Sequence, residues 1–448
     1  MGKFADKLAA KSPAIQRAYV GHYVPNLVKS GKLEKYYQTL ADFDFLAAKI
    51  NHPEFGVQAL IEDYDLADIP EAATQPEYDP EKAEVLKWIQ GALRLSGHIL
   101  AEDRSQLAGQ LLGRLLPYIN QPLIQELVEQ AKQSKAQPWL RPLTASLTNP
   151  NEALLRTLTG HSGWVNAVAV TPDGKLAISG SSDNTLKIWN LATGELRCTL
   201  TGHSGWVNAV AVTPDGKLAI SGSSDNTLKI WNLATGELRC TLTGHSDSVN
   251  AVAVSPNGKL AISGSDDKTL KIWNLATGES RCTLTGHNGL VTAIAVTPDG
   301  KLAISGSFDH SLKIWDLATG ELRCTLTGHR RKVLAVAVTP DGKLAISGSW
   351  ENTLKIWNLA TGELRCILTG HCNWVSAVAV TPDGKLAISG SWDSTLKIWN
   401  LATGEVFASF TGDSSLLCCA VAPDGVTIVA GETSGRVHFL RLEGIASP

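Results

Sequence analysis

The chain has 448 residues, a formal net charge of −3, 44% hydrophobic residues and 19% charged residues. A disordered protein would have fewer apolar residues and a larger net charge, and a membrane span would need about 18 consecutive apolar residues, which no stretch supplies. The composition is typical of a globular protein with two or three cores. The first residues form no apolar signal segment, so we expect a cytoplasmic location.

Charge is balanced along the whole chain. Residues 1–152 carry 16 basic and 19 acidic side chains, and residues 153–448 carry 24 of each. Binding to a phosphate backbone takes a basic face, which neither part supplies by its overall balance. We therefore expect neither nucleic acid nor a membrane among the partners.

The N-terminal part shows helical spacing of apolar residues. Asp79 and Pro80 followed by acidic residues predict a capped helix, with Val85, Ile89 and Leu93 on one face. Similar spacing continues through Leu107, Leu111, Leu115 and Ile119, and again from Leu123 to Ala131. We predict an all-α domain of about six helices over residues 1–141, with a loop at 66–78. A linker over 142–152, a repeat domain over 153–444 and a tail over 445–448 follow.

Two stretches of this domain carry a resemblance. Residues 41–50 (ADFDFLAAKI) and 59–66 (ALIEDYDL) resemble the helical linker arm of apoptosome-type (STAND/NB-ARC) signal-transduction ATPases. The resemblance implies an attached or associated ATPase or effector domain, with the repeats acting as a sensor. Every Gly-Lys pair is followed by Phe or Leu, so no phosphate-binding loop is present and no nucleotide cofactor is expected. The chain is then either a fragment of a longer protein or a stand-alone adaptor.

A 42-residue repeat dominates the remainder. Gly-His recurs at this interval from Gly160-His161 to Gly370-His371, and Gly412-Asp413 is an altered seventh copy. Within the first unit, residues 165–170, 175–179, 186–190 and 195–200 read as short strands separated by turns such as Pro172-Asp173-Gly174. Four strands per repeat are typical of one propeller blade.

The Gly-His, Pro-Asp-Gly and Ile-Trp-Asn motifs of each unit resemble the WD-repeat family, and Trp315-Asp316 keeps the literal dipeptide. The resemblance implies an all-β seven-bladed β-propeller over residues 153–444. Leu154–Leu158 match the fourth strand of a blade, so we expect them to complete the last blade and remove the open edges.

Each unit also contains His, Ser and Asp, which suggests a hydrolase triad. An active site is needed once per chain, whereas this set recurs in five units, each with a Trp ten residues after the Ser. We therefore expect no catalytic residue and no enzyme, but a structural network in each blade, as the family resemblance also implies. In the fifth unit Glu replaces Asp, and in the seventh Asp413, Ala430, Ser434 and Leu440 align with the four positions, so the network is lost there. The expected network comprises His161, Ser179, Asp183, Trp189; His203, Ser221, Asp225, Trp231; His245, Ser263, Asp267, Trp273; His287, Ser305, Asp309, Trp315; His329, Ser347, Glu351, Trp357; and His371, Ser389, Asp393, Trp399.

Five of the eight cysteines, from Cys198 to Cys366, recur once per repeat, and no Cys-x-x-Cys spacing occurs. We expect half-buried, reduced thiols and no metal site.

Positions that differ between near-identical units indicate a binding face. Two loops on one side of the disc carry aromatic residues, and a basic run follows one repeat His. Drift in tolerant surface loops is the alternative, but drift favours small polar residues. The predicted partner-binding residues are Trp164, Trp206, Phe308, Arg330, Arg331, Lys332, Trp350, Trp374 and Trp392.

We predict from these features a scaffold or sensor that binds a protein or peptide, with an acidic one suited to the basic run, while the helical arm relays binding to a signalling domain. A lectin-like or small-molecule sensor is the alternative, because Trp rings also stack on sugars and cations.

Overall fold

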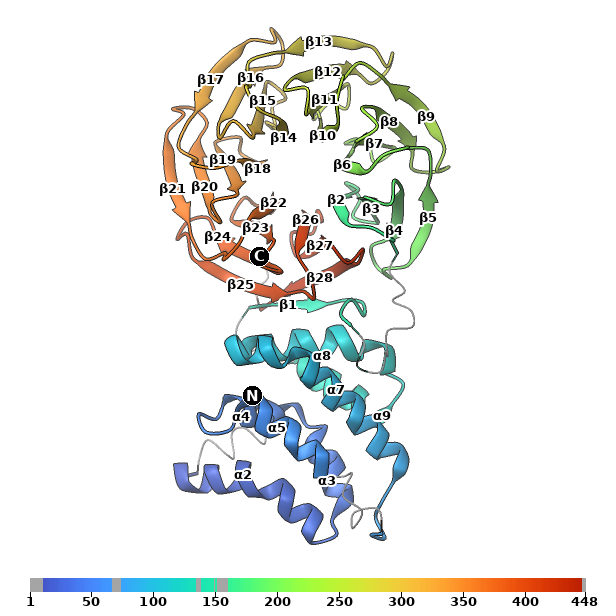
Figure 1. The fold of residues 1–448 in the computed structure, drawn as a ribbon, viewed down its shortest axis with the longest axis vertical. Coiled ribbons are helices and arrows are strands. Elements are labelled where there is room, and N and C mark those ends of the chain that lie inside the picture. Colours follow the sequence, from blue (N-terminus) through green and yellow to red (C-terminus); the bar gives the residue numbers. More distant parts are fainter. Residues whose placement is uncertain (1–10, 67–73, 134–137, 149, 151–159, 445–448) are drawn as a thin grey trace. The chain divides into compact units, whose positions relative to one another are not determined.

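The computed structural model describes residues 11–66, 74–133, 138–148, 150 and 160–444. Contacts divide the chain into two compact units, one of Met1–Thr157 with Leu442–Pro448 and one of Leu158–Arg441. The first unit is mainly helical and the second consists of β-sheets (Figure 1). This confirms the predicted fold class.

The helical unit has seven α-helices within its described residues, where the sequence predicts about six. The two stretches that resemble a linker arm lie mainly on α4 and α5. The helices are α2 (Pro13–Lys29), α3 (Leu33–Leu40), α4 (Phe43–Asn51), α5 (Gly56–Asp65), α7 (Pro80–Glu102), α8 (Leu107–Leu115) and α9 (Pro122–Lys132).

Helix α7 begins as the sequence predicts. The Asp79 carboxylate accepts hydrogen bonds from the backbone N–H groups of Glu81 at 3.0 Å and Lys82 at 3.2 Å. These bonds satisfy two of the donors that every helix start leaves unpaired. Ile89 and Leu93 of its apolar face are fully buried in the core of the unit.

The predicted continuation of the next helix to Ile119 is wrong. Leu107, Leu111 and Leu115 are buried on α8, but the α-helix ends at Leu115. A short 3-10 helix follows and contains Pro117, which has no N–H for the helical hydrogen bond. Ile119 is consequently 37% exposed.

Helices α4 and α5 share a buried ion pair. Lys49 and Asp63 are 2% and 5% exposed, and the Lys49 ammonium group donates to the Asp63 carboxylate. Burial raises the pKa of Asp63 to about 6, although Lys49 opposes the shift. Removing either partner would leave an uncompensated charge in the core, so the pair fixes how these two helices pack.

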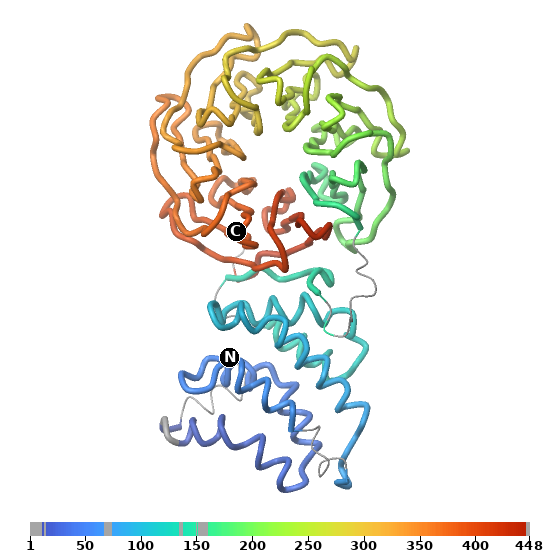
Figure 2. The backbone as a smooth tube through the Cα atoms, viewed as in Figure 1, coloured from blue at the N-terminus to red at the C-terminus, as the bar shows by residue number. Residues whose placement is uncertain are grey.

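Seven four-stranded antiparallel sheets form the second part of the fold, and the chain visits them in order round a ring (Figures 1 and 2). We call them blades 1 to 7. Blade 1 has β2 (Val165–Val170), β3 (Leu176–Ser181), β4 (Leu186–Asn190) and β5 (Leu196–Leu200); blade 2 has β6 (Val207–Val212), β7 (Leu218–Ser223), β8 (Leu228–Asn232) and β9 (Leu238–Leu242); blade 3 has β10 (Val249–Val254), β11 (Leu260–Ser265), β12 (Leu270–Asn274) and β13 (Ser280–Leu284). Blade 4 has β14 (Val291–Val296), β15 (Leu302–Ser307), β16 (Leu312–Asp316) and β17 (Leu322–Leu326); blade 5 has β18 (Val333–Val338), β19 (Leu344–Ser349), β20 (Leu354–Asn358) and β21 (Leu364–Leu368); blade 6 has β22 (Val375–Val380), β23 (Leu386–Ser391), β24 (Thr395–Asn400) and β25 (Val406–Thr411); blade 7 has β26 (Leu416–Val421), β27 (Thr427–Glu432) and β28 (Val437–Glu443).

The turns of each repeat fix the register of its blade. In blade 1, Gly174 between β2 and β3 has a φ of 68°, and Asn184 between β3 and β4 has a φ of 69°. Both residue types tolerate this left-handed conformation. The Asp173 carboxylate accepts hydrogen bonds from the Thr171 hydroxyl at 2.6 Å and from the Lys175 N–H at 3.1 Å. These tight turns place Ile178 opposite Ile188 in the sheet.

The hydrophobic core of the propeller lies between successive blades. Ile178 and Ile188 of blade 1 form one buried cluster with Val207 and Trp231 of blade 2. Gly180 permits this close approach, since a Cβ there would lie 2.6 Å from Val207 Cγ1. Cys198 packs half-buried against the cluster, and all eight cysteines are free.

The fourth strand of blade 7 is β1 (Trp139–Pro142), in the sheet order β1-β28-β27-β26. The sequence predicts Leu154–Leu158 for this position, and those residues lie outside the described ones. Leu140 is buried, and the Arg141 Nε–H donates to Glu443 Oε1 at 2.8 Å. The buried Leu140 and this ion pair attach β1 to β28 as the outermost strand of the blade. The strand also lies where the sequence predicts helices only.

Candidate functional site

Six blades contain a hydrogen-bonded row of four side chains at the positions that the sequence indicates. In blade 1, His161 Nδ1 lies 2.9 Å from Asp183 Oδ2, and His161 Nε2 lies 2.7 Å from Ser179 Oγ. Trp189 Nε1–H donates to the same Ser179 Oγ at 2.7 Å. Equivalent contacts join His203, Asp225, Ser221 and Trp231; His245, Asp267, Ser263 and Trp273; His287, Asp309, Ser305 and Trp315; His329, Glu351, Ser347 and Trp357; and His371, Asp393, Ser389 and Trp399.

The chemistry of the row follows from its donors and acceptors. An ionised carboxylate only accepts, so His161 Nδ1 carries the proton donated to Asp183, and Nε2 accepts from the Ser179 hydroxyl. Burial lowers the pKa of His161, although Asp183 opposes the shift. Burial would raise the pKa of Asp225 in blade 2, but hydrogen bonds from Thr227 and His203 hold it at about 2. The row therefore pairs a neutral imidazole with a carboxylate.

The serines of these rows are fully buried. Each has 0% of its surface exposed: Ser179, Ser221, Ser263, Ser305, Ser347 and Ser389. A catalytic nucleophile must contact its substrate. In this geometry the hydroxyls satisfy the indole and imidazole groups between strands and reach no substrate.

Blade 7 replaces the row with a different one. Asp413, Ala430, Ser434 and Leu440 do not reproduce the four contacts, but Glu432 and His438 are fully buried, with Glu432 Oε1 2.8 Å from His438 Nε2. The Glu432 carboxylate also accepts from the hydroxyl groups of Ser414 at 3.1 Å and Ser434 at 2.5 Å. Burial raises the pKa of Glu432, yet His438 and Ser434 hold it below its ordinary value. The predicted loss of the usual row in this blade is therefore confirmed, but the sequence did not predict the Glu432 and His438 cluster that replaces it.

The six predicted aromatic residues all lie in loops that join strands. Trp164, Trp206 and Trp374 precede β2, β6 and β22, while Phe308, Trp350 and Trp392 lie between the second and third strands of blades 4, 5 and 6. We call this set the aromatic face. Backbone hydrogen bonds hold the two loops of one blade together, as when Trp392 N–H donates to Trp374 O at 2.9 Å.

Five of these rings form a continuous row, which we call the aromatic ladder. Phe308 meets Trp350 at 5.7 Å between ring centroids, Trp350 stacks on Trp374 at 4.2 Å, Trp374 meets Trp392 at 5.3 Å, and Trp392 meets Trp164 at 5.8 Å. Blade 7 supplies only Ser415 and Thr433 at the equivalent positions. Trp164 is 46% exposed and Trp206 is 57% exposed, and no ring contact involves Trp206 in the described part of the chain.

The three predicted basic residues line one cavity, and Lys332 also contacts the aromatic ladder. Lys332 Nζ lies 4.0 Å from the ring centroid of Phe308 and 3.9 Å from that of Trp350, so it caps the aromatic ladder by cation–π contact. Arg330 and Arg331 are exposed. Both line a cavity of about 800 Å³ in blade 5, together with Trp350 and Glu351.

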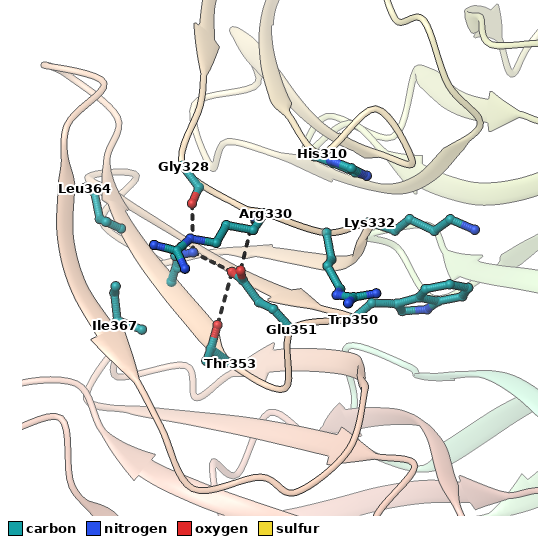
Figure 3. Close-up of a pocket in the computed structure, with 11 residues that line it drawn as sticks. His310, Gly328, Arg330, Lys332, Trp350, Glu351, Thr353, Leu364 and Ile367 are labelled. Carbon is teal, nitrogen blue, oxygen red and sulfur yellow. Dashed lines mark hydrogen bonds and ion pairs between the residues drawn. The ribbon is translucent and has the colours of Figure 1, made fainter.

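Figure 3 shows this cavity, with Trp350 and Lys332 at one end and Leu364 and Ile367 at the other. The Glu351 carboxylate lies between them and accepts from the Arg330 backbone N–H at 3.1 Å. Burial would raise the pKa of Glu351, but Lys355, Arg330 and His329 hold it at about 2. The carboxylate is therefore ionised and paired within the cavity wall.

Sequence reasoning missed the outer end of the cavity. Leu364 and Ile367 lie on the outermost strand β21, and they are 40% and 48% exposed. Ile367 carries a usable signal, because the same position is Thr199, Thr241, Thr283 or Thr325 in the preceding blades. Leu364 carries none, since most copies have Leu there.

The described residues offer neither a cluster of metal ligands nor a membrane-spanning helix. No group of three or more His, Cys, Asp or Glu side chains lies close enough to hold a metal ion. No helix in that part of the chain combines the length and apolar character that crossing a membrane requires.

Comparison with curated proteins gives short matches. A pre-mRNA-splicing factor PRP46 from Yarrowia lipolytica is 42% identical over 73 residues, which is 15% of this chain and 17% of the relative. Human pleiotropic regulator 1 is 45% identical over 49 residues, 11% of this chain and 10% of the relative. The nuclear distribution protein PAC1 of Scheffersomyces stipitis is 40% identical over 65 residues, 14% of this chain and 12% of the relative.

These matches correct one expectation. The cytoplasmic location was expected from the lack of a signal segment, and relatives named as pre-mRNA-splicing factors contradict it. Each match spans less than a fifth of the relative's length.

The repeat region also matches a protein family directly. The profile of the family described as "WD domain, G-beta repeat" matches residues 152–190, 194–232, 236–274, 278–316, 320–358 and 362–400. These segments begin after the described helices and cover more than half of the chain. With its seven four-stranded blades and their His, Ser, Asp and Trp rows, the chain belongs to the WD40-repeat family.

Proposed function

We propose that this chain is a non-enzymatic scaffold whose aromatic face binds a protein or peptide segment. The aromatic ladder carries the proposal, because its five rings contact one another in a row and are half-buried or, at Trp164, exposed, in loops that join strands. Aromatic residues with both apolar area and a polar edge are enriched where protein interfaces concentrate their binding energy. Relatives named as splicing factors are consistent with work inside protein assemblies.

The test uses replacements that the repeat itself tolerates. Ser182 and Ser224 occupy the position of Trp350 and Trp392, so Trp350→Ser/Trp392→Ser should fold while breaking the ladder. The matched control is Leu196→Ser/Leu238→Ser, which removes exposed apolar area from outer strands where blade 3 has Ser280. Proteins captured from native lysate are compared by quantitative mass spectrometry. We expect the ladder variant to lose about tenfold or more of a partner that the control retains. Equal capture by both variants would contradict binding of a partner at the aromatic face.

The helical unit has a proposed role of its own. By its resemblance to linker arms of signal-transduction ATPases, it would relay binding at the propeller to an attached or associated ATPase or effector domain. Spin labels on α7 and on β12 would measure whether a bound partner changes the distances between the two units. An unchanged distance distribution would contradict the relay and leave the binding role intact.

A small-molecule or lectin-like sensor is the second candidate. The 46% exposure of Trp164 and the 57% exposure of Trp206 favour it, because exposed indole rings stack on sugars and quaternary amines. Quenching of Trp fluorescence by simple sugars or choline, lost in Trp206→Ser, would support this candidate. Capture of a protein partner that neither compound displaces would contradict it.

A further inference from the structure

Blade 5 departs from the repeat at several positions that surround one cavity. The residue after the repeat His is Ser162, Ser204, Ser246, Asn288 or Cys372 elsewhere and Arg330 here. The following residue is Gly163, Gly205, Asp247, Gly289 or Asn373 elsewhere and Arg331 here. Glu351 and Ile367 are further departures, and Trp350 has a counterpart only in Trp392 of blade 6; all five residues line the same cavity. Random drift would scatter such changes over the ring.

Two of the departures are coupled through Lys355. In blades 1 to 4 the equivalent lysine donates to a threonine hydroxyl on the outer strand, as Lys187 Nζ does to Thr199 Oγ1 at 2.9 Å. Ile367 offers no such acceptor. Lys355 Nζ instead donates to Gly328 O at 2.9 Å and to the Glu351 carboxylate, which reaches it because Glu is one methylene longer than Asp. The Lys355 ammonium group therefore lies in the cavity wall, and the apolar side chain of Ile367 occupies the threonine position on the outer strand.

Charge at the cavity is left unbalanced by this arrangement. Glu351 is paired with Lys355 and also accepts a hydrogen bond from the Arg330 backbone. Among the described residues, no carboxylate forms an ion pair with Arg330, Arg331 or Lys332. Lys332 is held over two aromatic rings, which leaves the two arginine guanidinium groups as donors for a ligand. Guanidinium groups bind carboxylate and phosphoryl oxygens in bidentate geometry.

We propose that the cavity of blade 5 binds an acidic peptide segment, with its acidic groups at Arg330 and Arg331 and apolar side chains at Trp350 on one end and Leu364 and Ile367 on the other. This proposal rests on the proposed function and specifies the partner's chemistry. The order of apolar, basic and apolar wall residues in Figure 3 suits a segment in which acidic residues are flanked by apolar ones. Carboxylate and phosphoryl groups share the required charge.

The experiment measures fluorescence anisotropy of short labelled peptides with the full chain. All peptides have Leu and Phe flanking a central pair, which is Asp-Asp, phosphoserine-phosphoserine, Asn-Asn or Lys-Lys. We expect one of the two acidic peptides to bind at least about tenfold more tightly than the Asn-Asn peptide, and we expect its affinity to fall as salt is raised. The stronger of the two acidic peptides identifies the source of the charge.

Three variants locate the binding. Arg330→Ser/Arg331→Gly installs the residues of blade 2 and should abolish the preference for acidic peptides. Glu351→Asp/Ile367→Thr restores the usual lysine acceptor and should weaken binding several-fold through the loss of apolar contact. The control Lys301→Ser/Lys343→Ser removes two charges from β-turns, where both side chains are 79% exposed, and should bind as the parent does.

The outcomes separate this proposal from the broader one. Equal binding of Asp-Asp, phosphoserine and Asn-Asn peptides, or binding unaffected by Arg330→Ser/Arg331→Gly, overturns the acidic-segment proposal. So does a short RNA that binds to the same arginines more tightly than every peptide. If the Trp350→Ser/Trp392→Ser variant still loses its protein partner in any of these cases, the proposed function stands without this cavity.

Discussion

At the scale of residues, the His, Ser, Asp and Trp rows show how hydrogen bonds satisfy buried polar groups. Ser263 Oγ lies 2.7 Å from both Trp273 Nε1 and His245 Nε2, so one hydroxyl serves two ring systems. Neither ring nitrogen has water as an alternative, because Ser263 is fully buried and Trp273 is 1% exposed. Each hydrogen bond of the row adds little net stability. Removing one partner costs more free energy, because it leaves a buried polar group unpaired.

Removing this hydroxyl should be costly. We expect Ser263→Ala to lower the free energy of unfolding by about 1–3 kcal/mol, because it leaves a buried donor and a buried ring nitrogen unpaired. Urea unfolding followed by tryptophan fluorescence measures the change. The exposed Ser246 of the same blade is the matched control, and Ser246→Ala should change stability by less than about 0.5 kcal/mol. Equal effects of the two substitutions would show that the row carries no stability.

The buried histidines predict acid sensitivity. Burial, the largest cause, lowers the pKa values of His161, His203 and His245 and places that of His329 at about 4, against an ordinary value of 6.5. As pH falls through 6.5, the unfolded chain takes up protons that the folded imidazoles do not. The contribution to stability is thus complete above this pH and is lost towards pH 4.

We expect the protection of the propeller strands against hydrogen exchange to fall as the pH is lowered from 6.5 towards 4. Asp63 in the helical unit acts with the opposite sign, because its pKa is raised to about 6. The measurement is therefore hydrogen exchange of β-strand peptides at several pH values, which isolates the propeller. Protection that stays constant from neutral pH to pH 4 would contradict the assignment of neutral buried imidazoles.

Spacing along the sequence predicts which His, Ser, Asp and Trp meet, because each blade repeats the same local turns. It does not predict the Glu351–Lys355 pair, which depends on the absence of a hydroxyl at Ile367 on another strand. It likewise does not predict that Leu364 lines the cavity of blade 5, because most units have Leu at that position. Residues that differ from the repeat can be identified in the sequence. Residues that matter only because they lie close to others in the fold cannot.

At the scale of elements, blade 7 shows how a divergent repeat keeps its place in the ring. Its buried Glu432 and His438 take over from the usual row, and Arg436 Nη1 forms an ion pair with Asp413 Oδ2 at 2.7 Å. The four aligned residues and the two that replace the row, Glu432 and His438, all lie in the loops and strands that the repeat pattern predicts. The partner choice could not be predicted, because His438 lies on the third strand of its blade, whereas the usual His lies in the loop before the first strand.

Loss of the Glu432 charge should therefore destabilise this blade. We expect Glu432→Gln to cost about 3 kcal/mol, because His438, Ser414 and Ser434 are arranged round an ionised carboxylate. Hydrogen exchange should accelerate in β26–β28 before it does in β10–β12. The exposed Glu405→Gln is the control and should leave both regions unchanged. Uniform acceleration round the ring would contradict a local role for Glu432.

At the scale of the whole molecule, the propeller is a rigid ring of similar blades on which a few positions differ. The regular parts, namely period, strands, turns and rows, could be predicted because they follow from one local pattern repeated along the chain. The proposed binding face depends on which loops meet across the ring, so the ring contacts of the aromatic ladder from Phe308 to Trp164 emerge only in three dimensions. Two further features illustrate the same limit. The α-helix ends before Ile119 because of Pro117, and the pairing of β1 with β28 depends on contacts between distant parts of the chain.

The central claim is that a protein partner contacts the aromatic face, and site-specific photo-crosslinking tests it most directly. A photoreactive benzoylphenylalanine is placed at Trp374, within the ladder, and in a second protein at Leu238 on the outer strand β9, where the side chain is 43% exposed. We predict a crosslinked protein from position 374 that is absent from position 238 and disappears with Trp350→Ser/Trp392→Ser. Equal crosslinking at both positions, or crosslinking at position 238 alone, would contradict the account.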